Sequence, residues 1–315
     1  MINKDAKIYV AGHRGMVGSA IVRRLKADGF TNIITKTSKE LDLRNQRDVE
    51  MFFKENKPEL VFLAAAKVGG IGANIKYPSE FITDNLLIQS NVIKSAYENG
   101  VKKLLFLGSS CIYPKNAQQP LKEEYLLSGY LEPTNEGYAI AKIAGLKMCE
   151  YYNKQYGVDF SSVMPCNLYG ENDNFHPEHS HVMASLIRRF HEAKINNLPY
   201  VEVWGSGNQF REFMYIDDLA DAIMFVIENY KGHEFLNVGT GEDVTIKELS
   251  QTIKEIVGYE GEIRFDTSKP DGMFRKVMDV SKINNLGWKA KISLDEGIKK
   301  TYEWYLNNME VEVNK

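Results

Sequence analysis

Residues 7–18 read Lys7-Ile8-Tyr9-Val10-Ala11-Gly12-His13-Arg14-Gly15-Met16-Val17-Gly18. The apolar first part predicts a buried strand, and a helical pattern follows the glycines to about Asp28. This order is typical of a dinucleotide-binding unit, with the diphosphate at the helix N-terminus. Gly12 allows the turn, Gly15 lets the backbone approach the diphosphate, and Gly18 permits close packing of helix and strand. The spacing is G-x-x-G-x-x-G rather than G-x-G-x-x-G, so a purely structural turn is the alternative.

Short apolar segments alternate with helical patterns through the next part of the chain. We expect strands near residues 32–36, 59–64, 104–107 and 160–165, and two long helices near 79–99 and 138–156. The alternation predicts βαβ units and an α/β fold with a Rossmann-like doubly wound parallel sheet. We expect this domain over residues 1–170, with residues 212–240 returning to it. Residues 171–211 and 241–315 are expected to form a smaller α/β substrate-binding region.

Composition excludes several classes of partner. The chain has 315 residues, 43% of them hydrophobic, and a net charge of −3 from 39 basic and 42 acidic residues. We therefore expect no nucleic acid partner, and no apolar run approaches a membrane span. The N-terminus lacks a signal-peptide pattern, and Cys111, Cys149 and Cys166 have no metal-binding spacing. Reduced cysteines and a cytoplasmic location are expected, with disorder confined to the last few residues.

The end of the second strand bears on the choice of cofactor. NAD-binding proteins place an acidic residue about 20 residues after the glycine loop, on the ribose 2′-hydroxyl. Residues 35–39 contain no carboxylate, and Glu40 is the first one. Arg14, Lys36 and Lys39 could instead neutralise a 2′-phosphate. We therefore expect NADP(H), with a solvated basic turn as the alternative.

Four chemically active side chains are expected at one end of the sheet. Ser109 and Cys111 follow the strand Leu104–Leu107 and would share a face if the extended geometry persisted. Tyr138 and Lys142 are four residues apart on a helix and share a face. A lysine cation would lower the pKa of the phenol, which could then pass a proton to a carbonyl oxygen held by Ser109. A core tyrosine and a surface lysine are the alternative.

The segment after residue 170 contains three histidines, His176, His179 and His181. Pro177 and the irregular spacing argue against a metal site, so we expect no metal and one catalytic histidine, with neutral surface histidines as the alternative. Further on, a second diphosphate could be bound by cations, with Trp204 as a stacking platform. The candidate cations are Arg189, Arg211, Arg275 and Lys276, each of which could also be a solvated surface charge.

These motifs resemble the extended short-chain dehydrogenase/reductases of the epimerase/dehydratase type over nearly the whole chain. The shared motifs are the glycine loop, Gly108–Pro114, Glu132–Glu136, Tyr138–Gly145, Asp173–Pro177, Trp204–Gly207, Arg211–Phe213 and Lys269–Gly272. The resemblance implies a bifunctional 3,5-epimerase and NADPH-dependent 4-reductase that converts GDP-4-keto-6-deoxy-D-mannose to GDP-L-fucose. Separately from the resemblance, the outward apolar residues of the long helices near 79–99 and 138–156 could form a dimer face, although their full burial inside the monomer is equally allowed, and we expect a homodimer.

The same resemblance implies a role for individual residues. Ser109, Tyr138 and Lys142 match the reductase triad, and Cys111 and His181 match the acid/base pair for epimerisation. Arg189, Trp204, Arg211, Lys276 and Asp279 match substrate positions. The cofactor positions are Gly12 to Gly18, Ser38, Lys39, Leu41, Leu107, Gly108, Ser109, Ser110, Lys142, Pro165, Cys166, Asn167, Leu168 and His181.

Two positions depart from the family pattern. Cys166 stands where members often have threonine, and Ser38 stands where some have an arginine on the 2′-phosphate. Three other functions remain open at this point. A UDP-sugar 4-epimerase would not need Cys111, a 4,6-dehydratase would place acidic residues after the serines, and a non-catalytic NADP-sensing module would have a broken triad.

Overall fold

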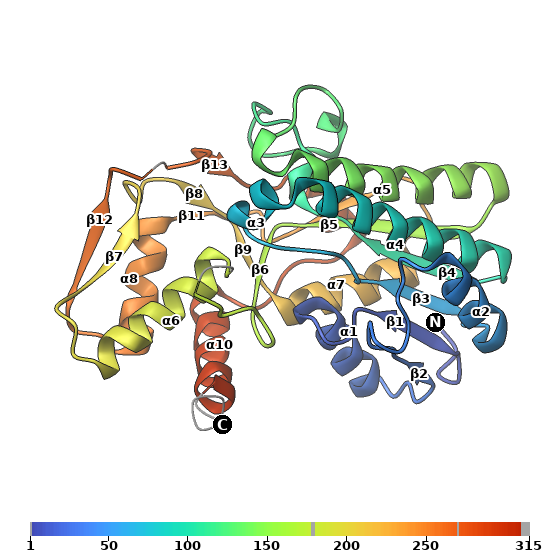
Figure 1. Ribbon diagram of the computed structural model, residues 1–315, viewed down its shortest axis with the longest axis horizontal. Helices are drawn as coiled ribbons and strands as arrows, with labels where there is room; N and C mark the ends of the chain where they lie inside the picture. The colour runs from blue at the N-terminus through green and yellow to red at the C-terminus, as the bar shows by residue number, and fades with distance from the viewer. Residues whose placement is uncertain (1, 178–179, 270, 310–315) are drawn as a thin grey trace.

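The computed structural model describes residues 2–177, 180–269 and 271–309. His179, Pro270 and the terminal residues expected to be disordered lie outside these ranges. A parallel six-stranded sheet, in the order β10-β5-β4-β3-β1-β2, forms the larger part of the molecule (Figure 1). Its strands are β1 (Ile8–Ala11), β2 (Ile33–Ile34), β3 (Leu60–Leu63), β4 (Lys103–Leu107), β5 (Asp159–Pro165) and β10 (Leu236–Val238).

Helices cover both faces of this sheet, which explains the continuous apolar strands (Figure 1). On one face α1 (Met16–Ala27) packs against α7 (Ile216–Asn229), and Arg23 reaches Asp217 at 2.8 Å. On the other face lie α2 (Gln46–Asn56), α4 (Pro78–Glu98) and α5 (Glu136–Tyr156), with α4 and α5 in extensive contact. The Rossmann-like layering expected from the sequence is confirmed.

The order of the strands reverses between β1 and β3. The chain passes from β1 to β2 on one side and then to β3 on the other, so β1 and β3 lie side by side at a topological switch point. Ligands of open α/β sheets bind beyond the carboxyl ends of the strands at such a point. Gly12 lies there with φ +86, and an added Cβ would come within 2.7 Å of the Ala65 nitrogen. A side chain at residue 12 is therefore excluded by both conformation and space.

Most of the remaining elements form a smaller region beside the carboxyl edge of the sheet (Figure 1). Its helices are α6 (Val182–Ile195), α8 (Ile246–Val257) and α10 (Leu294–Met309), whereas α9 (Ser281–Leu286) packs against β10 of the large sheet. Short strands pair as β7 (Tyr200–Trp204) with β12 (Glu262–Asp266), and as β11 (Val244–Thr245), β8 (Phe210–Arg211) and β13 (Arg275–Lys276). A capping box begins α8, because Thr245 and Glu248 each accept the other's backbone N–H. The domain boundaries stay a prediction.

The chain returns to sheet over residues 210–215, but not as one continuous strand. Residues 210–215 divide into β8 and β9 (Phe213–Tyr215), which belong to different sheets, and β9 pairs with β6 (Asn167–Tyr169). Glu212 separates the two strands and is only 1% exposed. Its buried carboxylate accepts backbone N–H groups from two other segments, so the chain changes sheets at this residue.

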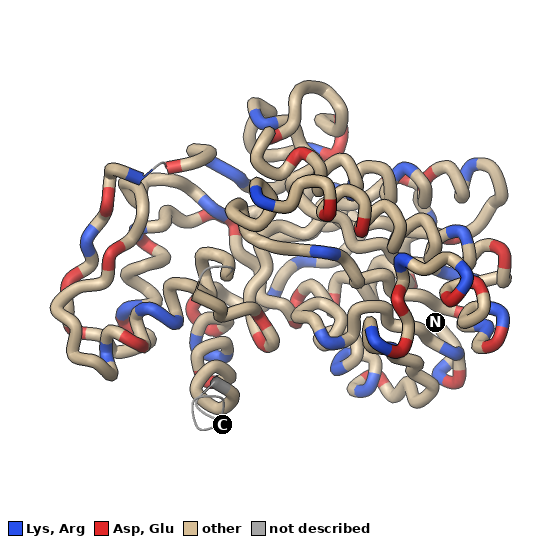
Figure 2. The backbone as a smooth tube through the Cα atoms, viewed as in Figure 1, with Lys and Arg blue, Asp and Glu red and all other residues tan. Residues whose placement is uncertain are grey.

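Lys and Arg are interspersed with Asp and Glu along the backbone tube in the view of Figure 2. None of the helices in the described part of the chain is long and apolar enough to cross a membrane.

Candidate active site

The start of α1 suits a bound diphosphate. The helix begins after Gly15 with no side-chain cap and no acidic residue in its first turn, so its backbone N–H groups are available to an anion. An added Cβ at Gly15 would meet only ordinary contact, 3.6 Å from the Gly12 oxygen, whereas one at Gly18 would come within 2.1 Å of the same atom. Packing therefore demands glycine at residue 18, and close approach of a ligand explains glycine at residue 15. His13 contributes a buried Nδ1 that has no partner among the described residues.

The residues expected around a 2′-phosphate lie at the end of β2. Glu40 accepts the backbone N–H and the hydroxyl of Thr37, at 2.8 and 2.7 Å, and these bonds lower its pKa. Lys36 Nζ lies 3.8 Å from Glu40 Oε1. Arg14, Ser38 and Lys39 are exposed, and Leu41 packs into the core. The carboxylate of Glu40 is exposed but is engaged by Thr37, whereas the exposed cations Arg14 and Lys39 have no carboxylate partner in the described part of the chain.

Ser109 and Cys111 lie together for a different reason from the one expected. Strand β4 ends at Leu107, and residues 110–112 form a 3₁₀ helix (η1), so strand alternation does not extend to Cys111. Instead Ser109 caps this turn by accepting the Cys111 N–H at 3.4 Å. Gly108 packs against Met164 of β5, because an added Cβ would come within 2.0 Å of that side chain. The turn thus places the Ser109 hydroxyl and the Cys111 thiol at the carboxyl end of β4.

Lys142 is hydrogen-bonded to the strand end that precedes this turn. Its side chain is buried, and Nζ donates to the carbonyl of Leu107 at 2.7 Å and lies 5.7 Å from the centroid of the Tyr138 ring. Burial lowers the Lys142 pKa to about 8, and the Cys111 thiolate opposes this. The expected lowering of the Tyr138 pKa by Lys142 is wrong. Burial of the phenol raises this pKa, and the hydrogen bond with Ser109 only partly offsets the rise. The phenol therefore stays protonated at neutral pH, the form that a proton donor needs.

Cys111 and His181 share one charged neighbour, Lys276. Burial raises the pKa of the Cys111 thiol, while the Ser109 hydroxyl and the Lys276 and Lys142 cations lower it. His181 precedes α6 and keeps an exposed edge, yet desolvation of its ring and then the Lys276 charge lower its pKa. The structure thus places the expected acid/base residues near one cation, with Cys111 directly beside the reductase residues.

The expected substrate residues lie on the smaller region. Lys276 on β13 pairs in register with Arg211 on β8, and the Arg211 guanidinium donates to the Phe210 carbonyl at 2.7 Å. Trp204 is 64% exposed, so its indole is available for stacking, and Lys269 Nζ lies over the ring at 5.6 Å from the centroid. Arg189 donates to the carbonyl of Glu202, two residues before Trp204.

Two of the expected polar residues have partners of their own. Arg275 donates to Asp243 at 2.6 Å in an exposed ion pair, and its place among the diphosphate cations stays a prediction. Asp279 accepts the backbone N–H of Ser281 at 2.9 Å at the start of α9, and this bond lowers its pKa against the opposing effect of burial. No group of three His, Cys, Asp or Glu side chains in the described ranges could hold a metal ion.

Glu212 has an organising role that the sequence analysis did not assign. Its carboxylate accepts the backbone N–H of Gly241 at 2.8 Å and that of Met278 at 2.7 Å, and Asn167 donates to its carbonyl at 2.8 Å. One buried residue thus joins the expected cofactor segment Pro165–Leu168, the turn after β10, and β13. The sequence signal that could have revealed this role is an acidic residue, Glu212, within the largely apolar residues 210–216.

We expect Glu212→Ala to lower the free energy of unfolding by about 3 kcal/mol, because two buried N–H groups would lose their acceptor. Chemical denaturation measures this value. Glu260→Ala, at an exposed residue, is the matched control and should change stability little. Equal stability of the two variants would show that the Glu212 hydrogen bonds contribute nothing.

Comparison with known proteins agrees with this geometry. Residues 8–239 match the NAD dependent epimerase/dehydratase family, and the chain belongs to that family of enzymes. It is 61% identical to GDP-L-fucose synthase 1 of Arabidopsis thaliana, covering 98% of this chain and 96% of that one. It is 54% identical to GDP-L-fucose synthase of Escherichia coli, covering 96% and 98%.

Solved structures agree as well. A gdp-l-fucose synthetase from Naegleria fowleri bound to NADP superposes with a TM-score of 0.91 at 30% identity, covering 98% of this chain and 97% of that one. MlghC, a GDP-mannoheptose C4 reductase from Campylobacter jejuni with NADP bound, gives 0.91 at 45% identity, covering 97% and 100%.

Proposed function

We propose that this enzyme is a bifunctional 3,5-epimerase and 4-reductase that converts GDP-4-keto-6-deoxy-D-mannose to GDP-L-fucose with NADPH. The observation that carries the proposal is the Cys111 thiol beside Ser109, Tyr138 and Lys142. A reductase needs only the last three residues, whereas exchange of a proton on carbon needs a further acid or base. High identity to GDP-L-fucose synthases over nearly the full chain supports the same substrate.

NADP(H) is the cofactor that the residues fit. The uncapped start of α1 would hold its diphosphate, Arg14 and Lys39 would face its 2′-phosphate, and NADP is bound in solved relatives. When bound, the cofactor supplies the hydride that C4 receives. Four of the expected cofactor-binding residues lie around the end of β4, next to the expected reaction site: Leu107, Gly108, Ser110 and Lys142.

Each catalytic residue has a distinct task in this mechanism. The C4 ketone acidifies the hydrogens on C3 and C5, and Ser109 and Tyr138 stabilise the enolate oxygen by hydrogen bonds. Cys111 and His181 remove a proton from one face and return a proton to the other, which inverts each carbon. After both inversions Tyr138 gives its proton to the C4 oxygen, leaving the product hydroxyl.

The nucleotide end of the substrate would lie over the smaller region. The exposed Trp204 indole offers a stacking surface, and Arg211 and Lys276 on neighbouring strands offer paired cations to the diphosphate. We place Arg189 and Asp279 at the edges of this surface.

A C4 reductase without epimerase activity is the second candidate, favoured by the similarity to the GDP-mannoheptose C4 reductase. The deciding experiment incubates the purified protein with NADPH and GDP-4-keto-6-deoxy-D-mannose and identifies the product by proton NMR. We expect GDP-L-fucose. A GDP-6-deoxyhexose with unchanged C3 and C5 would support the reductase alone, and no consumption of NADPH would refute both functions.

We expect the enzyme to prefer NADPH over NADH, because Arg14 and Lys39 are exposed near the end of β2 and the Glu40 carboxylate there is engaged by Thr37. Comparison of kcat/KM for the two cofactors tests this expectation. Arg14→Ala should weaken NADPH binding and leave NADH binding nearly unchanged, and equal efficiency of the two cofactors with the unmodified enzyme would contradict the assignment.

We infer a homodimer formed through α4 and α5, which lie together on one face of the sheet (Figure 1). Their exposed apolar residues include Leu87, Ile140 and Tyr151. Light scattering at micromolar concentration should give twice the mass of one chain, and Ile140→Glu should reduce it. A monomer mass for the unmodified protein would rule the dimer out. The cytoplasmic location stays a prediction.

A further inference from the structure

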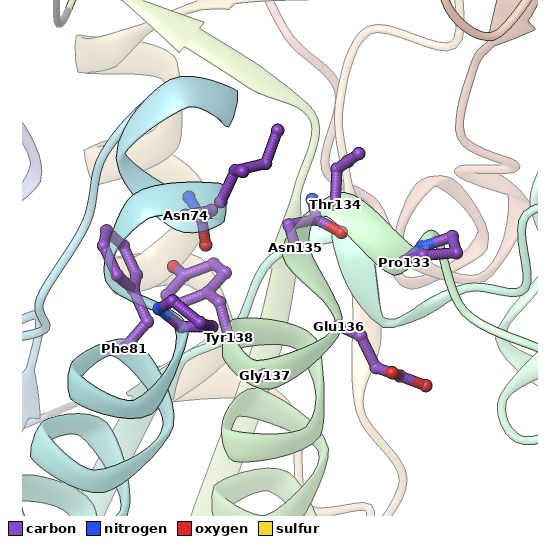
Figure 3. Close-up of a pocket in the computed structure, with 10 residues that line it drawn as sticks. Asn74, Phe81, Pro133, Thr134, Asn135, Glu136, Gly137 and Tyr138 are labelled. Atoms are coloured by element: carbon purple, nitrogen blue, oxygen red, sulfur yellow. The ribbon is translucent and has the colours of Figure 1, made fainter.

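A cavity of about 310 Å³ opens beside Tyr138 (Figure 3). It lies between α3 (Ile71–Lys76), the first turn of α4 and the start of α5. Ile75, Pro78 and Phe81 supply apolar walls, and the Phe81 ring packs edge to face against Tyr138 with centroids 6.2 Å apart. The cavity is therefore continuous with the surroundings of the catalytic phenol.

Asn74 provides a polar atom in this cavity. The residue is 6% exposed, and its Nδ2 donates to the carbonyls of Gly69 and Gly70 at 2.9 and 3.1 Å. These two bonds use both amide hydrogens and so fix which side-chain atom is the oxygen. Asn74 Oδ1 is buried without a hydrogen-bond partner among the described residues. Figure 3 shows this oxygen pointing toward the hydroxyl end of the Tyr138 ring.

A buried acceptor without a partner is costly, so this oxygen calls for a ligand that donates a hydrogen bond. In the proposed substrate, Tyr138 bonds the C4 oxygen, which has no hydrogen to donate. The hydroxyl nearest to that oxygen is on C3, because C5 carries the methyl group and the ring oxygen. We propose that Asn74 accepts a hydrogen bond from the C3 hydroxyl of the substrate hexose, an inference that rests on the proposed function.

This contact has a consequence for stereochemistry. C3 is one of the two inverted carbons, and inversion changes the direction in which its hydroxyl points. Asn74 is tied to the Gly69–Gly70 turn and cannot follow this movement without losing hydrogen bonds. A fixed acceptor therefore favours one C3 epimer beside Tyr138, and Asn74 helps to determine which epimer is reduced.

The test compares GDP-4-keto-6-deoxy-D-mannose with its 3-deoxy and 2-deoxy analogues, with NADPH consumption as the readout. Asn74→Ala should lower kcat/KM about tenfold or more for the parent substrate and the 2-deoxy analogue, because a buried hydrogen bond is lost. The 3-deoxy analogue should show almost no difference between the variant and the unmodified enzyme. An equal loss for all three compounds would overturn the proposal, because Asn74 would then act only through the loop or through water.

Asn135→Ala is the matched control. Asn135 lines the same cavity and also has a buried Oδ1 without a partner in the described ranges, but Figure 3 shows that oxygen pointing away from the Tyr138 hydroxyl. Asn135→Ala should therefore change kcat/KM by the same factor for all three compounds. If Asn74→Ala does not fold, the unmodified enzyme still tests the proposal. Its kcat/KM must be lower for the 3-deoxy analogue than for the 2-deoxy analogue. Absence of turnover with the parent substrate would refute the proposed function itself.

Discussion

Tyr138→Phe should lower NADPH-dependent reduction about a thousandfold, since a positioned proton donor contributes roughly 10²–10⁴ to a rate. The substitution removes only the phenolic oxygen. The helix α5, the Lys142 bond to Leu107 and the ring contact with Phe81 do not depend on that oxygen. Binding of NADPH should therefore be unchanged, and the loss should appear in kcat.

Steady-state kinetics and a fluorescence titration with NADPH measure the two quantities separately. Tyr151→Phe, at an exposed tyrosine of the same helix, is the matched control and should keep full activity. Turnover of Tyr138→Phe near the unmodified rate would show that another group protonates the C4 oxygen.

Cys111→Ala should separate epimerisation from reduction. The substitution removes the thiol and leaves Ser109, Tyr138 and Lys142 in place, so hydride transfer should survive in part. In heavy water we expect little uptake of deuterium from solvent at C3 and C5, and slow formation of an unepimerised GDP-6-deoxyhexose. Mass spectrometry and proton NMR of the product measure both effects.

The alternative is that Cys111 only fills a small apolar gap, as buried cysteines often do. Cys149→Ala is the matched control, because Cys149 is a free, buried cysteine in α5 beside Ser162. Normal deuterium exchange in both variants would remove Cys111 from the mechanism.

His181→Ala should also impair inversion, but one-sided exchange should persist because Cys111 remains.

The sequence predicted features governed by local patterns. The glycine loop and the alternation of strands and helices each depend on residues close together in the chain. Tyr138 and Lys142 could be paired because helix spacing alone puts them on one face. The family motifs then supplied roles for Cys111 and His181.

Other features depend on contacts between distant segments. Glu212 divides an apolar run because Gly241 and Met278 donate to it, and neither partner could be predicted from the run itself. Desolvation rather than Lys142 controls the pKa of Tyr138, and burial at one residue depends on the whole fold. Asn74 gave no signal in the sequence, because its unpaired oxygen is evident only where α3 meets the start of α5.

Deuterium incorporation by the unmodified enzyme tests the central claim most directly. The protein is incubated in heavy water with NADPH and GDP-4-keto-6-deoxy-D-mannose, and the reduced product is isolated and examined by proton NMR. We predict GDP-L-fucose that carries deuterium at both C3 and C5, because each inversion returns a proton from solvent. A reduced product with no deuterium at either carbon would contradict the account, and would leave Cys111 and His181 without a catalytic task.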